Sequence, residues 1–294
     1  MLLYLAVILY LSLYPWRFIP QSPGRTLVWV PLTGRFLILD AFLNLVFYVP
    51  LGAAAFLSLR RGWFAFLAAA ALGTFVSFAV ESLQLSIPNR VGNLLDLLAN
   101  SAGAVLGAAI AFIVTGHPIA SRLARFQPRT LLLWGLWAIW QVFTFLLPHS
   151  WSTIDILHEI VGSLTLALLA FDRMLPAAGA LLLAWLAFDE LRPFHFHGPP
   201  GRFWWLPFES WFVGAAESYY GLLFGKLFFY TAIQSILRAS NIRWVWALAW
   251  PAAILALGEW AQRYLPGRTP EATDMVLLAA GAMLLNWVQP DNRD

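Results

Sequence analysis

Cysteine is absent from this 294-residue chain, and only 11% of its residues are charged. The absence of cysteine excludes disulfide bonds, thiolate catalysis and cysteine-based metal sites. An ordinary soluble domain carries about 25% charged residues, so this chain has too few charges to cover a soluble globule. Basic residues are scattered, and Lys226 is the only lysine. No stretch is dense enough in positive charge to follow a phosphate backbone, which argues against nucleic acid as a partner.

Apolar residues dominate instead, since 61% of the chain is hydrophobic, 16 residues are tryptophan and the mean hydropathy is +0.72. We therefore expect the bilayer to be the solvent, where each segment must satisfy its own backbone and helices are favoured. Apolar runs predict an all-α, polytopic transmembrane bundle of about ten helices. The runs lie near residues 2–15, 38–58, 62–84, 94–115, 130–147, 153–171, 175–191, 219–239, 243–264 and 274–289. The first run lacks a preceding base and a following small-residue cleavage site, so we expect a retained helix rather than a signal peptide.

An even number of spans places both termini on one side of the membrane. Arginines are nearly balanced between the two sides, but those on the side of the termini stand mostly alone in short loops, whereas those on the other side lie among acids. We therefore predict a multi-pass protein of the bacterial inner (plasma) membrane with both termini in the cytoplasm. The basic balance of the chain fits loops that face an anionic membrane surface.

An internal repeat is visible in two stretches 178 positions apart, Glu81–Gly103 and Glu259–Gly281. Six identities fall in one gapless register, in which Glu81, Gln84, Pro88, Arg90, Asp96 and Gly103 match Glu259, Gln262, Pro266, Arg268, Asp274 and Gly281. Earlier segments also align with small gaps, such as NLVFY (44–48) with KLFFY (226–230). The sequence therefore predicts two parallel four-helix repeats, 1–115 and 175–294, joined by a two-helix spacer over 116–174.

The first repeat resembles the VanZ-like family of membrane proteins. The resemblance rests on Asp40, Asn44, Pro50, Leu51, Gly52, Glu81, Gln84, Arg90, Asp96, Asn100, Gly103 and Gly107. The second repeat departs from the pattern, with Lys226 in place of Asn44, Ala232 in place of the proline and Leu278 in place of Asn100. The resemblance implies a bacterial envelope protein of a family named for its association with glycopeptide antibiotic resistance, whose biochemical activity is poorly defined.

A polar cluster is expected where the third and fourth predicted helices meet. Glu81 and Gln84 share one helix face, and Asp96 and Asn100 share a face of the next helix. The turn between them is short, so the helices are expected to be antiparallel neighbours, with Arg90 within reach of Glu81, Asp96 or both. Gly103 and Gly107 continue the second stripe and would let another helix approach closely.

Three interpretations of this cluster are open. It is a structural clamp of paired charges, a site for an anionic head group such as a phosphate or lipid-linked sugar, or a proton or ion path. In a head-group site, Arg90 would contact the anion, with Gln84, Asn100, Asp40 and Asn44 as further ligands. Glu81 and Asp96 are the candidate catalytic acid or base. The counterparts in the second repeat are Glu259, Gln262, Arg268, Asp274 and Lys226.

Four further features each have an alternative, purely structural interpretation. Asp40 can serve as a partner of a helix dipole rather than as a ligand. Lys226 either extends its ammonium to water or pairs with Glu259 or Glu217. His195 and His197 have the spacing of a metal-ligand pair, with Asp189 and Glu190 nearby, but no third ligand is obvious, so we predict no metal and no cofactor. The tryptophan-rich segments WVPL (29–32) and WWLPF (204–208) form either an interfacial aromatic belt or a roof over the polar clusters.

The sequence leaves three classes of function open. They are binding or transport of envelope lipids or lipid-linked glycans, an enzyme acting on such a substrate at the outer leaflet, and an accessory protein of envelope assembly. The expected partners are membrane lipids, lipid-linked envelope precursors or envelope-assembly proteins. The sequence favours binding or processing of an anionic lipid. Whether the chain is an enzyme stays open, because no nucleophile occurs at a telling spacing.

Overall fold

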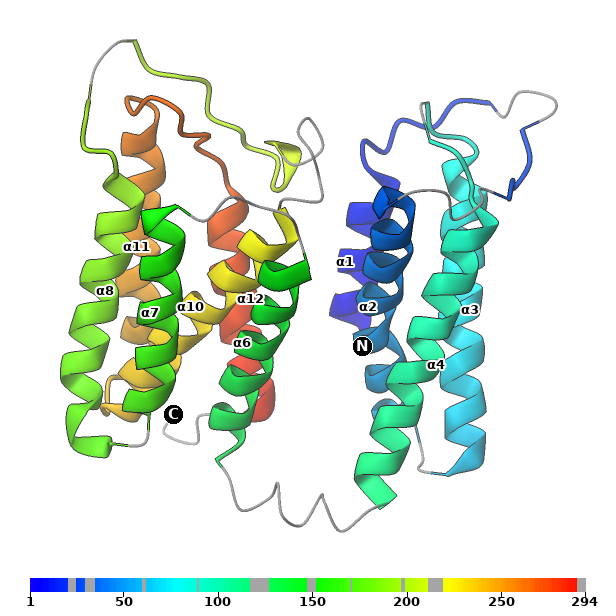
Figure 1. Cartoon of the computed structure of the whole chain (residues 1–294), viewed down its shortest axis with the longest axis horizontal. Helices are drawn as coiled ribbons and strands as arrows, with labels where there is room; N and C mark the ends of the chain where they lie inside the picture. Colours follow the sequence, from blue (N-terminus) through cyan, green and yellow to red (C-terminus); the bar gives the residue numbers. More distant parts are fainter. Residues whose placement is uncertain are drawn as a thin grey trace. The chain divides into compact units, whose positions relative to one another are not determined.

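The computed structural model of the chain describes residues 1–20, 25–29, 35–59, 62–88, 90–116, 127–146, 152–169, 171–196, 199–210 and 219–289. These residues form ten α-helices and one short 3-10 helix, and no β-strand occurs among them. The predicted all-α class is therefore confirmed. The chain divides into two compact parts, the N-terminal unit, Met1–Leu123, and the C-terminal unit, Ala124–Asp294 (Figure 1).

The described residues of the N-terminal unit form four helices: α1 (Leu2–Leu13), α2 (Arg35–Ser58), α3 (Trp63–Gln84) and α4 (Leu94–Gly116). Helix α4 packs along α2 and α3, and α1 packs mainly on α3. The approach of α2 and α4 depends on glycine, because a Cβ atom on Gly103 would lie 2.0 Å from the Leu45 carbonyl oxygen, and one on Gly107 would lie 1.9 Å from that of Val49. The close approach expected at these glycines is thus made between α4 and α2.

The C-terminal unit is built around α10 (Tyr219–Ala239), which contacts α6, α8, α11 and α12. These neighbours are α6 (Pro128–Leu146), α8 (Leu175–Leu191), α11 (Trp244–Gln262) and α12 (Thr273–Val288), with α7 (Thr153–Leu168) alongside α6 and α8 and the 3-10 helix η1 (Asp172–Met174) before α8. Every residue from 228 to 237 is buried. The helices α6 and α7, which occupy the expected spacer, lie within this compact unit.

Among the described residues, four helical segments are long and apolar enough to cross a membrane: Asp40–Ser58, Trp63–Gln84, Leu94–Thr115 and Trp244–Gln262. Two shorter apolar helices, Tyr4–Leu13 and Thr273–Val288, accompany them. Large apolar side chains such as Phe64 and Phe75 are exposed along α3, as expected of a surface that faces hydrocarbon rather than water. The chain is therefore a helical membrane protein, as the composition predicts.

Candidate functional site

Two carboxylates meet at the polar end of the α3–α4 hairpin. Glu81 is 2% exposed, and its Oε2 accepts a hydrogen bond of 2.9 Å from the backbone N–H of Asn93. The side-chain amide of Asn93 donates to Asp96 Oδ1 at 3.2 Å, and its Oδ1 accepts from the Leu95 N–H at the start of α4. Asn93 therefore caps α4 and joins both carboxylates to one turn.

Helix α2 adds Asp40 and Asn44 to Glu81, Asn93 and Asp96. We name these five residues the N-terminal cluster. The side-chain amide of Asn44 donates to the Asp96 carboxylate, and Asp40 interacts electrostatically with both Glu81 and Asp96. Gln84 points elsewhere, because its amide donates to the backbone carbonyl of Ser12 on α1 at 3.0 Å. Of the residues predicted to contact a ligand, the structure thus gathers Asp40 and Asn44 around the carboxylates, while Gln84 ties α3 to α1.

Asn100 lies one helical turn below Asp96 and is buried. Its Nδ2 donates to Ser77 Oγ at 3.1 Å, but its Oδ1 is buried without a hydrogen-bond partner in the described residues. The Tyr48 hydroxyl faces Ser77 and Glu81 and, among the same residues, makes no hydrogen bond of ordinary geometry. Two buried polar atoms therefore stay unsatisfied directly beneath the carboxylates, which is unusual in a folded protein.

A loop covers the turn of the hairpin. Val28 forms a bridge with Asn93, its N–H donates to the Gly92 carbonyl at 3.0 Å, and its carbonyl accepts from Leu94 at 2.9 Å. The guanidinium of Arg25 fixes the loop by donating to the carbonyls of Leu85, Ile87 and Arg90. The described part of the tryptophan loop, 25–29, therefore pairs with the polar turn, while positions 30–32 of WVPL lie outside the described residues.

Arg90 differs from the expectation. It is half-buried and acts electrostatically on Glu81, but its guanidinium forms no hydrogen bond or ion pair with any residue that the structure describes. The expected close pair with Glu81 or Asp96 is not formed, and N–H groups of Asn93 bond to these carboxylates instead. Arg90 is thus a cation beside the cluster without a fixed acceptor among the described residues.

The C-terminal unit repeats the backbone pattern. Glu259 Oε2 accepts a 2.7 Å hydrogen bond from the N–H of Glu271, which is the residue 178 positions after Asn93. Trp204 bridges to Glu271, and its carbonyl accepts from the Ala272 N–H at 3.0 Å. The WWLPF loop therefore pairs with its hairpin in the same manner as the loop around Val28.

The side chains of this second site are more highly charged. Lys226 Nζ lies 2.6 and 2.7 Å from the two oxygens of Asp274, which is fully buried. The predicted pairing with Glu259 is wrong, since Glu259 interacts with Lys226 only at longer range, and Glu217 lies outside the described residues. Lys226 reaches Asp274 because both project into the contact between α10 and α12.

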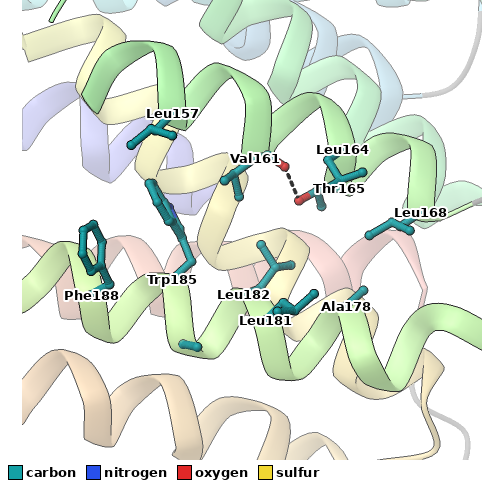
Figure 2. A pocket seen from close by; sticks show the side chains of 11 residues that line it. Leu157, Val161, Leu164, Thr165, Leu168, Ala178, Leu181, Leu182, Trp185 and Phe188 are labelled. Atoms are coloured by element: carbon teal, nitrogen blue, oxygen red, sulfur yellow. Dashed lines mark hydrogen bonds between the residues drawn. The ribbon is translucent and has the colours of Figure 1, made fainter. Parts of the chain in front are cut away.

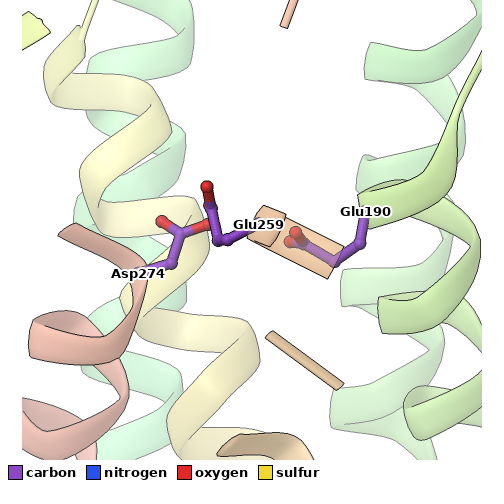
Figure 3. Close-up of side chains that lie close together, drawn as sticks. All are labelled: Glu190, Glu259 and Asp274. Carbon is purple, nitrogen blue, oxygen red and sulfur yellow. The ribbon is translucent and has the colours of Figure 1, made fainter. Parts of the chain in front are cut away.

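A third carboxylate joins Glu259 and Asp274 from α8. Gln262 Nε2 donates to Glu190 Oε2 at 2.6 Å, and carboxylate oxygens of Glu190, Glu259 and Asp274 all lie within 4.8 Å of one another (Figure 3). We name these three residues with Lys226 and Gln262 the C-terminal cluster. The sequence placed Glu190 only beside the histidines. Glu190 lies 178 positions after Ser12, and the amides of the matching residues Gln84 and Gln262 donate to the Ser12 carbonyl and the Glu190 carboxylate, respectively.

The residues around this cluster are held by hydrogen bonds. Arg268 donates to the backbone carbonyls of Arg192 and Asp189, so unlike Arg90 its guanidinium is occupied. Glu271 lies outside the helices and accepts a 2.8 Å hydrogen bond from Ser210. Burial raises the pKa of the Glu271 carboxyl, since burial disfavours its charged form.

The histidine segment does not join the cluster. His195 is exposed, and its Nδ1 contacts the Pro193 carbonyl at 2.8 Å, while His197 lies outside the described residues. Asp189, which the metal interpretation paired with these histidines, instead lies 3.2 Å from His158 Nε2.

An apolar groove of about 450 Å³ runs between α7 and α8 (Figure 2). Leu157, Val161, Leu164 and Leu168 line one side, and Leu181, Leu182, Trp185 and Phe188 line the other. The hydroxyl of Thr165 also faces the groove but donates to the Val161 carbonyl at 2.7 Å, so it offers no unused donor. This lining suits a hydrocarbon chain and offers nothing to a polar substrate.

Comparison with known proteins adds one match. A family model described as VanZ/LLP1 matches residues 1–115, the part that carries the N-terminal cluster. No curated protein and no solved structure matches the chain.

Proposed function

We propose that this chain is a VanZ-like protein of the bacterial inner membrane that binds the anionic head group of an envelope lipid or lipid-linked glycan at the outer leaflet. The proposal starts from the similarity of residues 1–115 to the VanZ/LLP1 family and from the membrane character of the helices. The loop-covered hairpin end of the N-terminal unit is the binding site, and it faces outward when both termini are cytoplasmic. A link to glycopeptide resistance rests on the resemblance alone.

The second part of the proposal is that α8, α10, α11 and α12 form a divergent VanZ-like copy of α1 to α4. The matching hydrogen bonds onto Glu81 and Glu259 and the matching bridges at Val28 and Trp204 support it. Trp16 and Phe194, 178 positions apart, also share a left-handed backbone conformation, with φ of 54° and 64°. The pairs Glu81 and Glu259 and Trp16 and Phe194 keep the 178-position register, and Val28 and Trp204 are 176 positions apart, as expected where earlier segments align with small gaps.

The observation that most directly supports a head-group site is that the guanidinium of Arg90 is available to a ligand. Arg90 lies beside the buried cluster with no fixed acceptor among the described residues, whereas Arg268 is bound to two carbonyls. An arginine fork is suited to phosphate oxygens, and near the membrane surface it meets the head group while apolar helix faces meet the chains. Glu81 and Asp96 are the acid and base candidates if the bound lipid is also processed.

Lipid binding by Arg90→Gln, with Arg268→Gln as the matched control, tests the proposal. The purified chain is titrated with phosphatidylglycerol or a polyprenyl phosphate in a neutral detergent, with phosphatidylcholine as the uncharged comparison, and bound lipid is counted by native mass spectrometry. Losing a hydrogen bond to a charged group costs about 1.5–3 kcal/mol. Arg90→Gln should therefore weaken anionic lipid binding about 10- to 100-fold.

The controls separate binding from folding. Arg90→Gln should unfold at the temperature of the parent chain, because its guanidinium holds no described group. Arg268→Gln should lose thermal stability and keep its affinity for the anionic lipid. Equal lipid affinity of Arg90→Gln and the parent chain would contradict the head-group site. A large loss of stability in Arg90→Gln would instead favour an accessory, structural role for the cluster.

A further inference from the structure

Three helices of the N-terminal unit each direct two polar residues, one helical turn apart, toward the same place. The pairs are Asn44 and Tyr48 on α2, Ser77 and Glu81 on α3, and Asp96 and Asn100 on α4. Contacts join the layers: Asn44 bonds to Asp96, Asn100 bonds to Ser77, and Tyr48 faces Ser77 and Glu81. We name these six residues the oxygen cage, since each of them has an oxygen in its side chain.

The C-terminal unit places different residues at the matching positions. Lys226 and Tyr230 stand where Asn44 and Tyr48 stand, and Glu259 and Asp274 keep the two acids. Leu255 and Leu278, both fully buried, replace Ser77 and Asn100. In this unit the Lys226 ammonium bonds to Asp274, and the Tyr230 hydroxyl lies close to the same carboxylate. The C-terminal unit thus contains its own cation and keeps only the tyrosine among the three lower oxygen-bearing residues.

We propose that the oxygen cage of the N-terminal unit binds a hard divalent cation, of the Mg²⁺, Mn²⁺ or Ca²⁺ class, where the C-terminal unit has the Lys226 ammonium. The comparison rests on the equivalence of the two units in the proposed function. Carboxylate, amide and hydroxyl oxygens are the ligands that such cations prefer. Asn44 supplies no charge where Lys226 supplies one, so Glu81 and Asp96 have no cation bonded to them among the described residues.

Two unsatisfied atoms point to a ligand independently of the acids. Asn100 is 4% exposed and Tyr48 is 1% exposed, yet the Oδ1 of one and the hydroxyl of the other have no partner in the described residues. A buried polar group without a partner is destabilising. A cation coordinated by these oxygens removes that cost, and the C-terminal unit reduces it without a ligand, because Leu278 stands where Asn100 stands. The three acids of the C-terminal cluster are no second cation site, because Lys226 already bonds to Asp274 and interacts with the other two.

Thermal unfolding of the full chain in neutral detergent, without added anionic lipid, tests whether the oxygen cage binds a divalent cation. After treatment with a chelator, MgCl₂, MnCl₂ and CaCl₂ are compared with NaCl of equal ionic strength, and Mn²⁺ binding is counted by electron paramagnetic resonance. At least one of the divalent ions should raise the unfolding temperature, and Mn²⁺ should bind with a stoichiometry of one per chain. No effect beyond that of NaCl from any divalent ion would overturn the proposal and leave water as the occupant of the cage.

Two substitutions in the oxygen cage introduce the residues that the C-terminal unit has at the matching positions. Asn44→Lys provides the built-in ammonium, so it should abolish the divalent shift and raise stability in the absence of cation. Asn100→Leu removes one oxygen and should weaken Mn²⁺ binding at least about tenfold. Gln84→Leu, outside the cage, is the matched control that should keep Mn²⁺ binding.

Unchanged Mn²⁺ affinity in both cage variants would also overturn the proposal. If Asn44→Lys fails to fold, Asn100→Leu decides alone. If the oxygen cage binds no divalent cation, the Arg90 lipid experiment is unaffected, because that experiment compares lipids under one set of ions. Failure of the head-group site likewise leaves the Mn²⁺ stoichiometry unchanged, so the two proposals stand or fall separately.

Discussion

Lys226 and Asp274 form an ion pair in which Asp274 is fully buried and the lysine side chain is about a quarter exposed. Glu190 and Glu259 lie close to Asp274, and in the described part of the chain the lysine is the one cation in an ion pair with any of the three acids. Removing one partner of a buried pair leaves an uncompensated charge, whereas removing both leaves an apolar contact.

Lys226→Met should therefore destabilise the C-terminal unit by about 3–5 kcal/mol, because Asp274 loses its counter-ion in a buried site. The double variant Lys226→Met with Asp274→Leu should recover most of that loss. Reversible unfolding in detergent, followed by tryptophan fluorescence, of the parent chain, the two single variants and the double variant gives the four stabilities needed for a double-mutant cycle. Additive losses in the double variant would show that the two residues do not stabilise each other.

The bonding partner of each charged side chain was the feature of the site that the sequence predicted least well. The sequence predicts that Lys226 pairs with an acid, but the rotation of α10 selects Asp274 on α12 rather than Glu259 on α11. An apolar helix gives no amphipathic face from which this rotation could be read. Arg90 was misplaced for a related reason, since the sequence does not reveal that Asn93 occupies both carboxylates.

Helices are the elements that the sequence predicts best. The ten apolar runs correspond to the ten described helices, and the run at 175–191 matches α8 at both ends. Bilayer thickness and backbone satisfaction constrain these segments locally, so length and composition are sufficient. The pairing of Val28 with Asn93 is long-range and has no local signal, which is why the roof over the hairpin was only one of two alternatives.

The contact between α2 and α4 depends on the absence of side chains at Gly103 and Gly107. Gly107→Ala would place a methyl group 1.9 Å from the Val49 carbonyl oxygen, so the helices would have to separate. We expect a loss of at least about 1–3 kcal/mol, as for other overpacked contacts. Gly135→Ala in α6 is the control, because a Cβ there meets nothing within 4 Å. Equal unfolding temperatures for the two variants would contradict the glycine-dependent contact.

At the scale of the whole molecule, the proposed function requires that the proposed copies, α1 to α4 and α8 with α10 to α12, are parallel. In each copy, the polar hairpin follows the third helix and the loop that pairs with it follows the first. Parallel copies place both hairpins on one face of the membrane, and cytoplasmic termini make that face the outer one. A head-group site at the outer leaflet requires this orientation, so membrane topology tests the proposed function without any lipid.

The cysteine-free chain allows this topology to be measured with single cysteines at exposed positions. Trp63 begins α3, and Val91 lies in the turn that follows the other end of this helix, which at about 1.5 Å per residue is long enough to cross the hydrocarbon core. Trp205 lies in the loop that pairs with the hairpin of the C-terminal unit. A membrane-impermeant maleimide added to intact cells should label Val91→Cys and Trp205→Cys, and Trp63→Cys only after permeabilisation.

Labelling of Val91→Cys and Trp63→Cys from the same side would show that α3 does not span the membrane. Opposite labelling of Val91→Cys and Trp205→Cys would exclude parallel units. The reverse pattern for all three would keep the bundle but move the head-group site to the cytoplasmic leaflet, where an outer-leaflet lipid-linked glycan cannot reach it.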